Sequence, residues 1–129
     1  MPGIDECLLH AMRLPGARGA ALVDWTSGLA LGTVGDAAGD DHETAAAETA
    51  ELARMAAEHP TFAPVGPADS QAPVEDLVVT TRTCYHVLRF VETSFDSSVL
   101  MHLWLDRAEG NLALARLRMR DLTERLVLE

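Results

Sequence analysis

One short segment, "SVLMHLWLD" at residues 98–106, constrains the fold more than any other part of this sequence. It is apolar at nearly every position, and its pattern predicts a β-strand with no polar face. A strand that is apolar on both faces is normally a central strand, covered on each side by other elements. The sequence therefore predicts a sheet that has this strand in its interior and helices on both faces.

Hydrophobic periodicity and turn residues predict the remaining elements. Apolar residues at helical spacing predict three helices, at residues 3–14, at residues 41–58 and in a final segment capped by Asn111. Short apolar runs bounded by turn residues predict four further strands, at residues 20–23, 29–31, 77–82 and 85–92. The order α-β-β-α-β-β-β-α and the tight connections favour one five-stranded antiparallel sheet, in the α+β class.

The chain is predicted to be a single domain over residues 1–129, because 129 residues suit one hydrophobic core. Residues 59–74 contain four prolines, which exclude regular structure and predict a surface loop, either an ordered crossover or a mobile segment. Asp40 is predicted to cap the second helix, with Glu43 three residues later completing a capping box.

Charge and cysteine content restrict the classes of partner. The formal net charge is −10, and all ten basic residues are arginines, so the average surface repels phosphate backbones and nucleic acid is not expected as a partner. Cys7 and Cys84 are far apart and lack CxxC spacing, which is typical of a reduced intracellular protein. The sequence shows no signal peptide and no apolar run long enough for membrane insertion, so we expect a cytoplasmic protein.

Motifs of catalysis, cofactor binding and metal binding are missing from the sequence. The glycine-rich stretch at residues 15–32 lacks the lysine of a phosphate-binding loop, because the chain contains no lysine. The five histidines of the chain are scattered and form no HExxH motif, and the two cysteines form no CxxC motif. Ser27 lies outside any GxSxG elbow. The sequence therefore predicts a non-enzymatic protein with no catalytic residue, cofactor or metal site.

The second predicted helix, residues 41–58, is unusually rich in alanine. Leu52 and Met55 are its only large apolar residues. Small side chains permit another backbone to approach closely, which favours a tightly packed helix. Alanine is also the best intrinsic helix former, so helix propensity explains the same composition equally well.

The order of these elements, with "PGARGAALVDWTSGLALG" after the first helix, resembles the roadblock family of dynein light-chain-related domains in its bacterial form. In that family the first helix ends at a motif close to "PGVRGALVVSxDGLPLA". The matching positions are Pro15, Gly16, Arg18, Gly19, Ala20, Gly28 and Leu29. Trp25, Thr26 and Ser27 depart from the motif, and the proline-rich loop is long.

The resemblance implies a homodimer or a heterodimer in which the second helices and edge strands associate, and of these we expect a homodimer. Bacterial members are commonly regulators or scaffolds for Ras-like small GTPases. Carried onto this sequence, it places the dimer surface on the second helix and the third strand, at Ala46, Ala50, Leu52, Ala53, Ala57, Leu77, Val79 and Thr81. Arginine is suited to contacts with phosphate and acidic groups. The candidates for contact with the partner are Arg18, Arg54 and Arg116.

Two other functions fit the same pattern. One is a profilin-like or sensor-type domain that binds a small ligand between sheet and helices, around His86, His102 and Trp104. A pocket lined by these residues would favour it. The other is an assembly scaffold for a signalling complex without contact to a GTPase.

Overall fold

The computed structural model describes residues 3–63, 74–91 and 98–126. Its helices are α1 (Ile4–Ala11), α2 (His42–Glu58) and α3 (Leu112–Arg125), with single 3₁₀ turns at η1 (Ala38–Asp40) and η2 (Pro60–Phe62). Its strands are β1 (Ala17–Asp24), β2 (Leu29–Gly35), β3 (Asp76–Thr80), β4 (Cys84–Val91) and β5 (Val99–Asp106).

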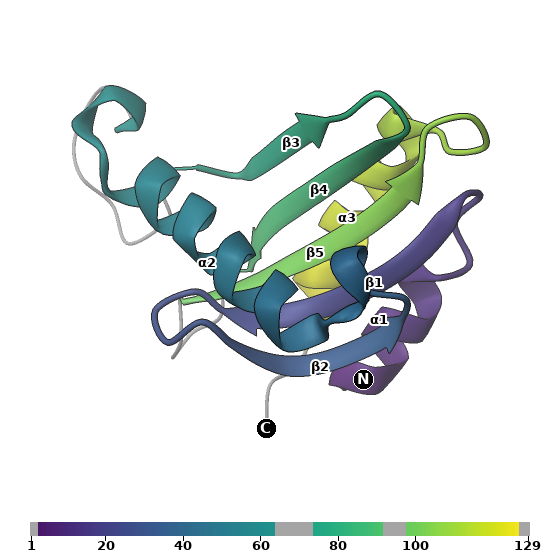
Figure 1. Ribbon diagram of the computed structural model, residues 1–129, viewed down its shortest axis with the longest axis horizontal. Helices are drawn as coiled ribbons and strands as arrows, with labels where there is room; N and C mark the ends of the chain where they lie inside the picture. Colours follow the sequence, from purple (N-terminus) through teal and green to yellow (C-terminus); the bar gives the residue numbers. More distant parts are fainter. Residues whose placement is uncertain (1–2, 64–73, 92–97, 127–129) are drawn as a thin grey trace.

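The five strands form one antiparallel sheet in the order β2-β1-β5-β4-β3. Helix α2 crosses one face of this sheet, and α1 and α3 lie on the other (Figure 1). The α+β class, the order of the elements and the position of β5 in the centre of the sheet are therefore confirmed. Strands β2 and β3 form the two edges.

Two hydrophobic clusters lie on opposite faces of the sheet. The larger one joins α1 and α3 to strand residues such as Leu22, Met101 and Leu103. The smaller one joins the alanines of α2 to Leu88 and Leu100. Each helix within the described ranges is too short or too polar to span a lipid bilayer.

The caps of the helices follow the sequence closely, with one shift. Asp41, not Asp40, is the N-cap of α2, and its carboxylate accepts hydrogen bonds from the backbone N–H groups of Glu43 and Thr44. Asp40 instead takes a positive φ of 62° at the end of η1, which places it outside the helix. Asn111 caps α3 as predicted, by accepting from the N–H of Leu114.

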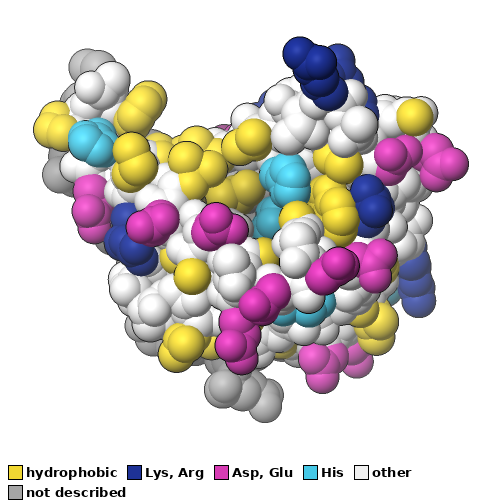
Figure 2. Space-filling view, in the orientation of Figure 1, with side chains coloured by type: hydrophobic (Ala, Val, Ile, Leu, Met, Phe, Trp, Pro, Cys, Tyr) yellow, Lys and Arg dark blue, Asp and Glu magenta, His cyan; other side chains and the backbone are white. Residues whose placement is uncertain are grey.

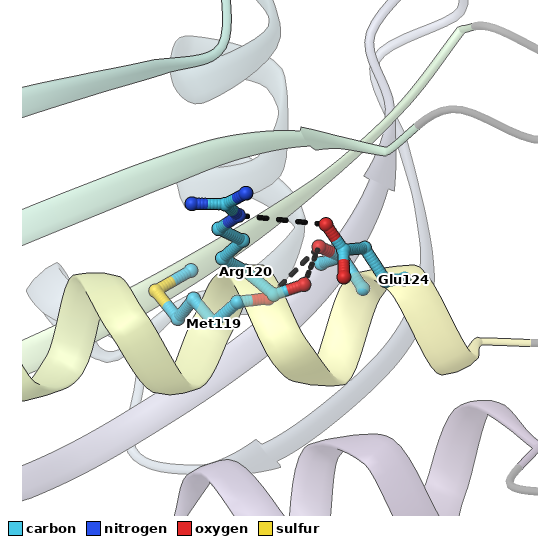
Figure 3. Close-up of polar contacts among 4 residues, drawn as sticks. Met119, Arg120 and Glu124 are labelled. Atoms are coloured by element: carbon cyan, nitrogen blue, oxygen red, sulfur yellow. Dashed lines mark hydrogen bonds and ion pairs between the residues drawn. The ribbon is translucent and has the colours of Figure 1, made fainter.

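The last turns of α3 hold polar contacts within the helix itself. The hydroxyl of Thr123, a buried residue, donates to the carbonyl of Met119 at 2.8 Å (Figure 3). One turn of helix separates Arg120 from Glu124, and their side chains form an exposed ion pair at 3.4 Å (Figure 3). These contacts satisfy side chains within the helix, as expected for i,i+4 neighbours.

Several predicted boundaries differ from the structure by a few residues. The first helix ends at Ala11 because residues 12–14 turn toward Pro15, which disfavours helix in the residue before it. The proline-rich segment was predicted to lack regular structure, yet Pro60 begins the single turn η2, where its fixed φ suits a first helical position. Residues 64–73, and the predicted connection at residues 93–96, lie outside the described residues.

Gly19 marks the closest approach within the hairpin of β1 and β2. It pairs with Gly35, whose φ is +73°, and a Cβ atom on Gly19 would overlap the carbonyl oxygen of Asp36. The sheet therefore requires glycine at position 19, one of the positions that carries the family resemblance. The requirement is steric, because the obstructing atom belongs to the backbone and not to a flexible side chain.

We expect Gly19→Ala to lower the free energy of unfolding by about 1–3 kcal/mol, the usual cost of forcing an extra carbon into a packed site. Urea denaturation followed by circular dichroism measures the change. Gly3→Ala is the matched control, since a Cβ atom there would meet nothing within 4 Å. Equal stability of the two variants would contradict the steric requirement at Gly19.

Candidate interaction surface

The sheet face that carries α2 is the candidate functional surface, because large hydrophobic side chains remain exposed on it. Leu52 and Met55 of α2 are 39% and 58% exposed, Phe62 of η2 is 55% exposed, and Val79 of β3 is 38% exposed. Figure 2 shows hydrophobic side chains gathered on this face along α2 and toward β3. Exposed apolar groups that lie together are typical of an interaction site.

The edge strand β3 adjoins this surface. It pairs with β4 on one side, from Asp76↔Arg89 to Thr80↔Tyr85. On its other side no strand of the described residues pairs with it, and the side chain of Val79 is exposed on the α2 face. An edge with exposed apolar side chains favours pairing with another strand.

The residues predicted for a dimer surface divide into two groups. Ala46, Ala50 and Ala53 are at most 3% exposed and pack against Leu88 and Leu100 of the chain's own sheet. Their small side chains therefore bring α2 close to the sheet and are not available to a second copy. The remaining predicted residues are exposed or half-buried: Leu52, Ala57, Leu77, Val79 and Thr81.

Thr81 lies just beyond β3, where it closes the turn to β4. Its N–H donates to the carbonyl of Cys84 at 2.8 Å, and its hydroxyl oxygen accepts from the N–H of Cys84 at 2.9 Å. The prediction had placed Thr81 inside the strand. Met55 and Phe62 are exposed apolar residues of the same surface that the prediction did not include.

Two histidines lie in contact beside α2. Nδ1 of His86 on β4 is 2.9 Å from Nε2 of His102 on β5, and the rings stack with centroids 5.2 Å apart. His86 also stacks on Trp104, over which the guanidinium of Arg18 lies at 4.0 Å from the ring centroid. The structure thus brings together the three residues His86, His102 and Trp104 of the alternative ligand-binding prediction.

Burial controls the charge of this histidine pair. Desolvation lowers the pKa of His86, and it lowers the pKa of His102 to about 4, with a smaller contribution from the neighbouring His86. Both rings are therefore neutral near pH 7, and one donates an N–H hydrogen bond to the other. Among the described residues, no group of three or more His, Cys, Asp or Glu side chains lies where it could hold a metal ion.

The space beside the histidines is a shallow hollow and not an enclosed pocket. It measures about 270 Å³ and is lined by residues that include Leu52, Val79, His86 and His102. Figure 2 shows histidine side chains at the bottom of a hollow on this face. Small-molecule pockets usually have about 300–1,000 Å³ and bury most of the ligand. The hollow is therefore smaller than a usual ligand pocket. It is continuous with the apolar surface, because Leu52 and Val79 belong to both.

Cys84 lies beside Arg18, at the end of the series of contacts that runs from His102 through His86 and Trp104 to Arg18. Burial tends to raise the pKa of its thiol, but hydrogen bonds from Thr83, Trp104 and Arg18 outweigh this effect and lower it. Nη1 of Arg18 lies 3.8 Å from Sγ of Cys84. Cys7, on the opposite side of the sheet, has a pKa raised to about 11 by burial alone.

The three arginines predicted for partner contact do not converge. Arg18 lies over Trp104, and Nη1 of Arg54 donates to the carbonyl of Trp25 at 2.8 Å. Arg116 projects from α3, on the other side of the sheet, and forms two hydrogen bonds of 2.8 and 3.0 Å with the carboxylate of Asp76. Arg18 and Arg54 therefore remain near the candidate surface, whereas Arg116 is occupied elsewhere.

We expect the contribution of neutral His102 to the free energy of unfolding to be complete above pH 6.5 and to be lost as the pH falls toward 4. The unfolded chain binds a proton at His102 more readily than the folded chain does, because burial lowers the pKa in the fold. A pKa lowered from 6.5 to about 4 corresponds to a loss of about 3 kcal/mol. The difference in unfolding free energy between the natural chain and His102→Gln, measured from pH 7 to 4, isolates this loss. His59→Gln, at the exposed end of α2, is the control, and a difference independent of pH would contradict the assignment.

Comparison with known proteins places the fold. The sequence matches no family model and no curated protein. Among solved structures, MglB of Myxococcus xanthus matches with a TM-score of 0.75 at 17% identity, covering 94% of this chain and 82% of that one. An MglB structure described as having a tetrameric arrangement matches at 0.72 and 21% identity, with coverages of 94% and 82%.

A third match is a roadblock/LC7 domain from Streptomyces avermitilis, with a TM-score of 0.68 and 19% identity, covering 95% of this chain and 93% of that one. These matches extend over 94–95% of the chain. The fold expected from residues 15–32 and from the order of the elements is thus confirmed: the chain has the fold of the bacterial roadblock/LC7 domain.

Proposed function

We propose that this protein is a non-enzymatic homodimer that regulates or scaffolds a partner protein, and that the partner is a Ras-like small GTPase. The observation that carries the proposal is the exposed apolar surface formed by α2, η2 and the edge strand β3. The roadblock/LC7 fold supports it, since the resemblance to that family implies dimers that act on small GTPases.

The dimer follows from the chemistry of this surface. If β3 pairs with β3 of a second copy, the free backbone groups of the edge are satisfied and the two sheets become continuous. The same arrangement covers Leu52, Met55 and Val79, which are exposed in a single chain. The proposed dimer surface therefore consists of Leu52, Met55, Ala57, Phe62, Leu77, Val79 and Thr81.

The GTPase would contact the face that the two copies form together. Arg18 and Arg54 lie on the α2 side of the sheet, and arginine is the side chain best suited to phosphate or acidic groups of a partner. We infer that these arginines position the partner through such contacts. An assembly scaffold without GTPase contact would use the same dimer surface.

A small-ligand site is the second candidate function. The hollow of about 270 Å³ beside His86 and His102 favours it, because two neutral imidazoles offer one hydrogen-bond donor and one acceptor. Its continuity with Leu52 and Val79 favours coverage by a second copy instead. The oligomeric state therefore distinguishes the two functions.

Leu52→Asp combined with Val79→Asp should convert the dimer to a monomer, because two carboxylates would lose their water in an apolar contact. Sedimentation equilibrium at micromolar concentration should show at least about a tenfold weaker self-association, which corresponds to about 1.4 kcal/mol. The control is Leu117→Asp, since Leu117 is 64% exposed on α3, on the opposite face. A natural chain that is monomeric at this concentration would overturn the proposed dimer.

Binding to a GTPase should depend on the bound nucleotide. We expect the Ras-like GTPase encoded nearest to this protein's gene to bind more tightly in one nucleotide state, when loaded with GDP or with a non-hydrolysable GTP analogue. The affinity, measured by biolayer interferometry, should fall for the dimer-breaking variant and remain for Leu117→Asp. A natural dimer that binds neither nucleotide state would favour the scaffold function.

A further inference from the structure

A second surface lies on the opposite face of the sheet, in the groove between α1 and α3. The groove encloses about 630 Å³, and its apolar lining includes Leu14, Leu114 and Leu122. These leucines belong to the edge of the larger hydrophobic cluster, so the floor of the groove continues the core. The groove therefore offers apolar contact between two helices.

The polar lining of this groove is mainly cationic, in a protein with a formal net charge of −10. Arg13 of the segment after α1 and Arg118 of α3 line it, together with Arg125, whose Nη2 lies 3.5 Å from a carboxylate oxygen of Asp121. Nη1 of Arg13 lies 3.4 Å from Nδ1 of His10.

Among the described residues, Arg13 and Arg118 form no ion pair. The acidic groups of the groove are Glu6 and Asp121, and Asp121 is already paired. Two guanidinium groups therefore remain available beside a leucine floor, with one unpaired carboxylate to oppose them. On a chain with twice as many acidic as basic residues, this arrangement selects an anionic and partly apolar ligand.

We propose that the groove between α1 and α3 docks an amphipathic helix of a partner protein that carries carboxylates beside a stripe of leucine-like residues. A helix laid between two helices buries one apolar stripe, with contacts at i, i+3, i+4 and i+7. Its flanking carboxylates would meet Arg13 and Arg118, and each guanidinium group can donate two parallel hydrogen bonds to one carboxylate. The charge of the groove thus determines the class of partner.

This docking surface is independent of the proposed dimer. Arg13, Leu114 and Arg118 belong to the side of the sheet that carries α1 and α3, whereas Leu52 and Val79 belong to the α2 side. Variants of the groove should therefore leave the sedimentation behaviour unchanged. A failure of the docking proposal can then be distinguished from a failure of the dimer.

In the test, the full chain is immobilised and exposed to a displayed library of helical peptides about four turns long. The charged positions and the apolar positions of these peptides are varied independently. We expect enrichment of peptides with two or more carboxylates beside a leucine stripe. Affinities of the enriched peptides, measured by fluorescence polarisation, should fall about tenfold for Arg13→Gln combined with Arg118→Gln. They should also fall with added salt.

Arg120→Gln is the matched control, because Arg120 is exposed on the same helix but does not line the groove. Its affinity for the enriched peptides should equal that of the natural chain. Leu114→Ala separately tests the apolar floor and should weaken the same peptides. Enrichment of basic or uncharged peptides, or binding that the double variant retains, would overturn the proposal. Complete competition by inorganic phosphate would also overturn it, since an anion site alone would then explain the binding.

Discussion

Burial of β5 on both faces is the constraint on which the rest of the structure depends. Met101, Leu103 and Leu105 point to one face and Leu100 to the other, and all four are fully buried. A single helix layer cannot cover both sets of side chains, so the chain needs helices on each side of the sheet. Helices α1 and α3 cover one side, and α2 covers part of the other.

The incomplete cover by α2 creates the candidate surface. Its alanines allow the helix to lie close to the sheet over Leu100, but further along β5 the same face carries His102 and Trp104, which are only half-buried. A strand that is apolar at one end of this face and aromatic and polar at the other suits a helix that crosses it diagonally. The uncovered part then adjoins β3, which places the exposed apolar residues next to a free sheet edge.

Sequence patterns predicted the elements because each is specified locally, by the periodicity of α3, by the cap at Asn111 and by the glycines of the first hairpin. Sequence patterns could not show whether the alanines in α2 pack against the chain's own sheet or against a second copy. Both kinds of close packing require the same small side chains. The contact of His86 with His102 depends on the register of β4 and β5, where His86 pairs with Trp104 and His102 pairs with Leu88. The sequence analysis grouped these residues, but the register that brings the two ring nitrogens within 2.9 Å is defined only once the strands are aligned.

The two sheet faces differ in the chemistry that they leave exposed, and this difference follows from their helices. Leu52 and Met55 of the alanine-rich helix α2 are exposed, so the face around this helix presents apolar groups that suit a second copy of the same surface. Helix α3 carries four arginines on a chain whose other segments are mostly acidic, so the groove beside it is cationic. Like charges disfavour self-association through the groove, whereas the apolar face has no such barrier. A dimer formed through α2 and β3 would therefore keep both cationic grooves accessible on its outer side.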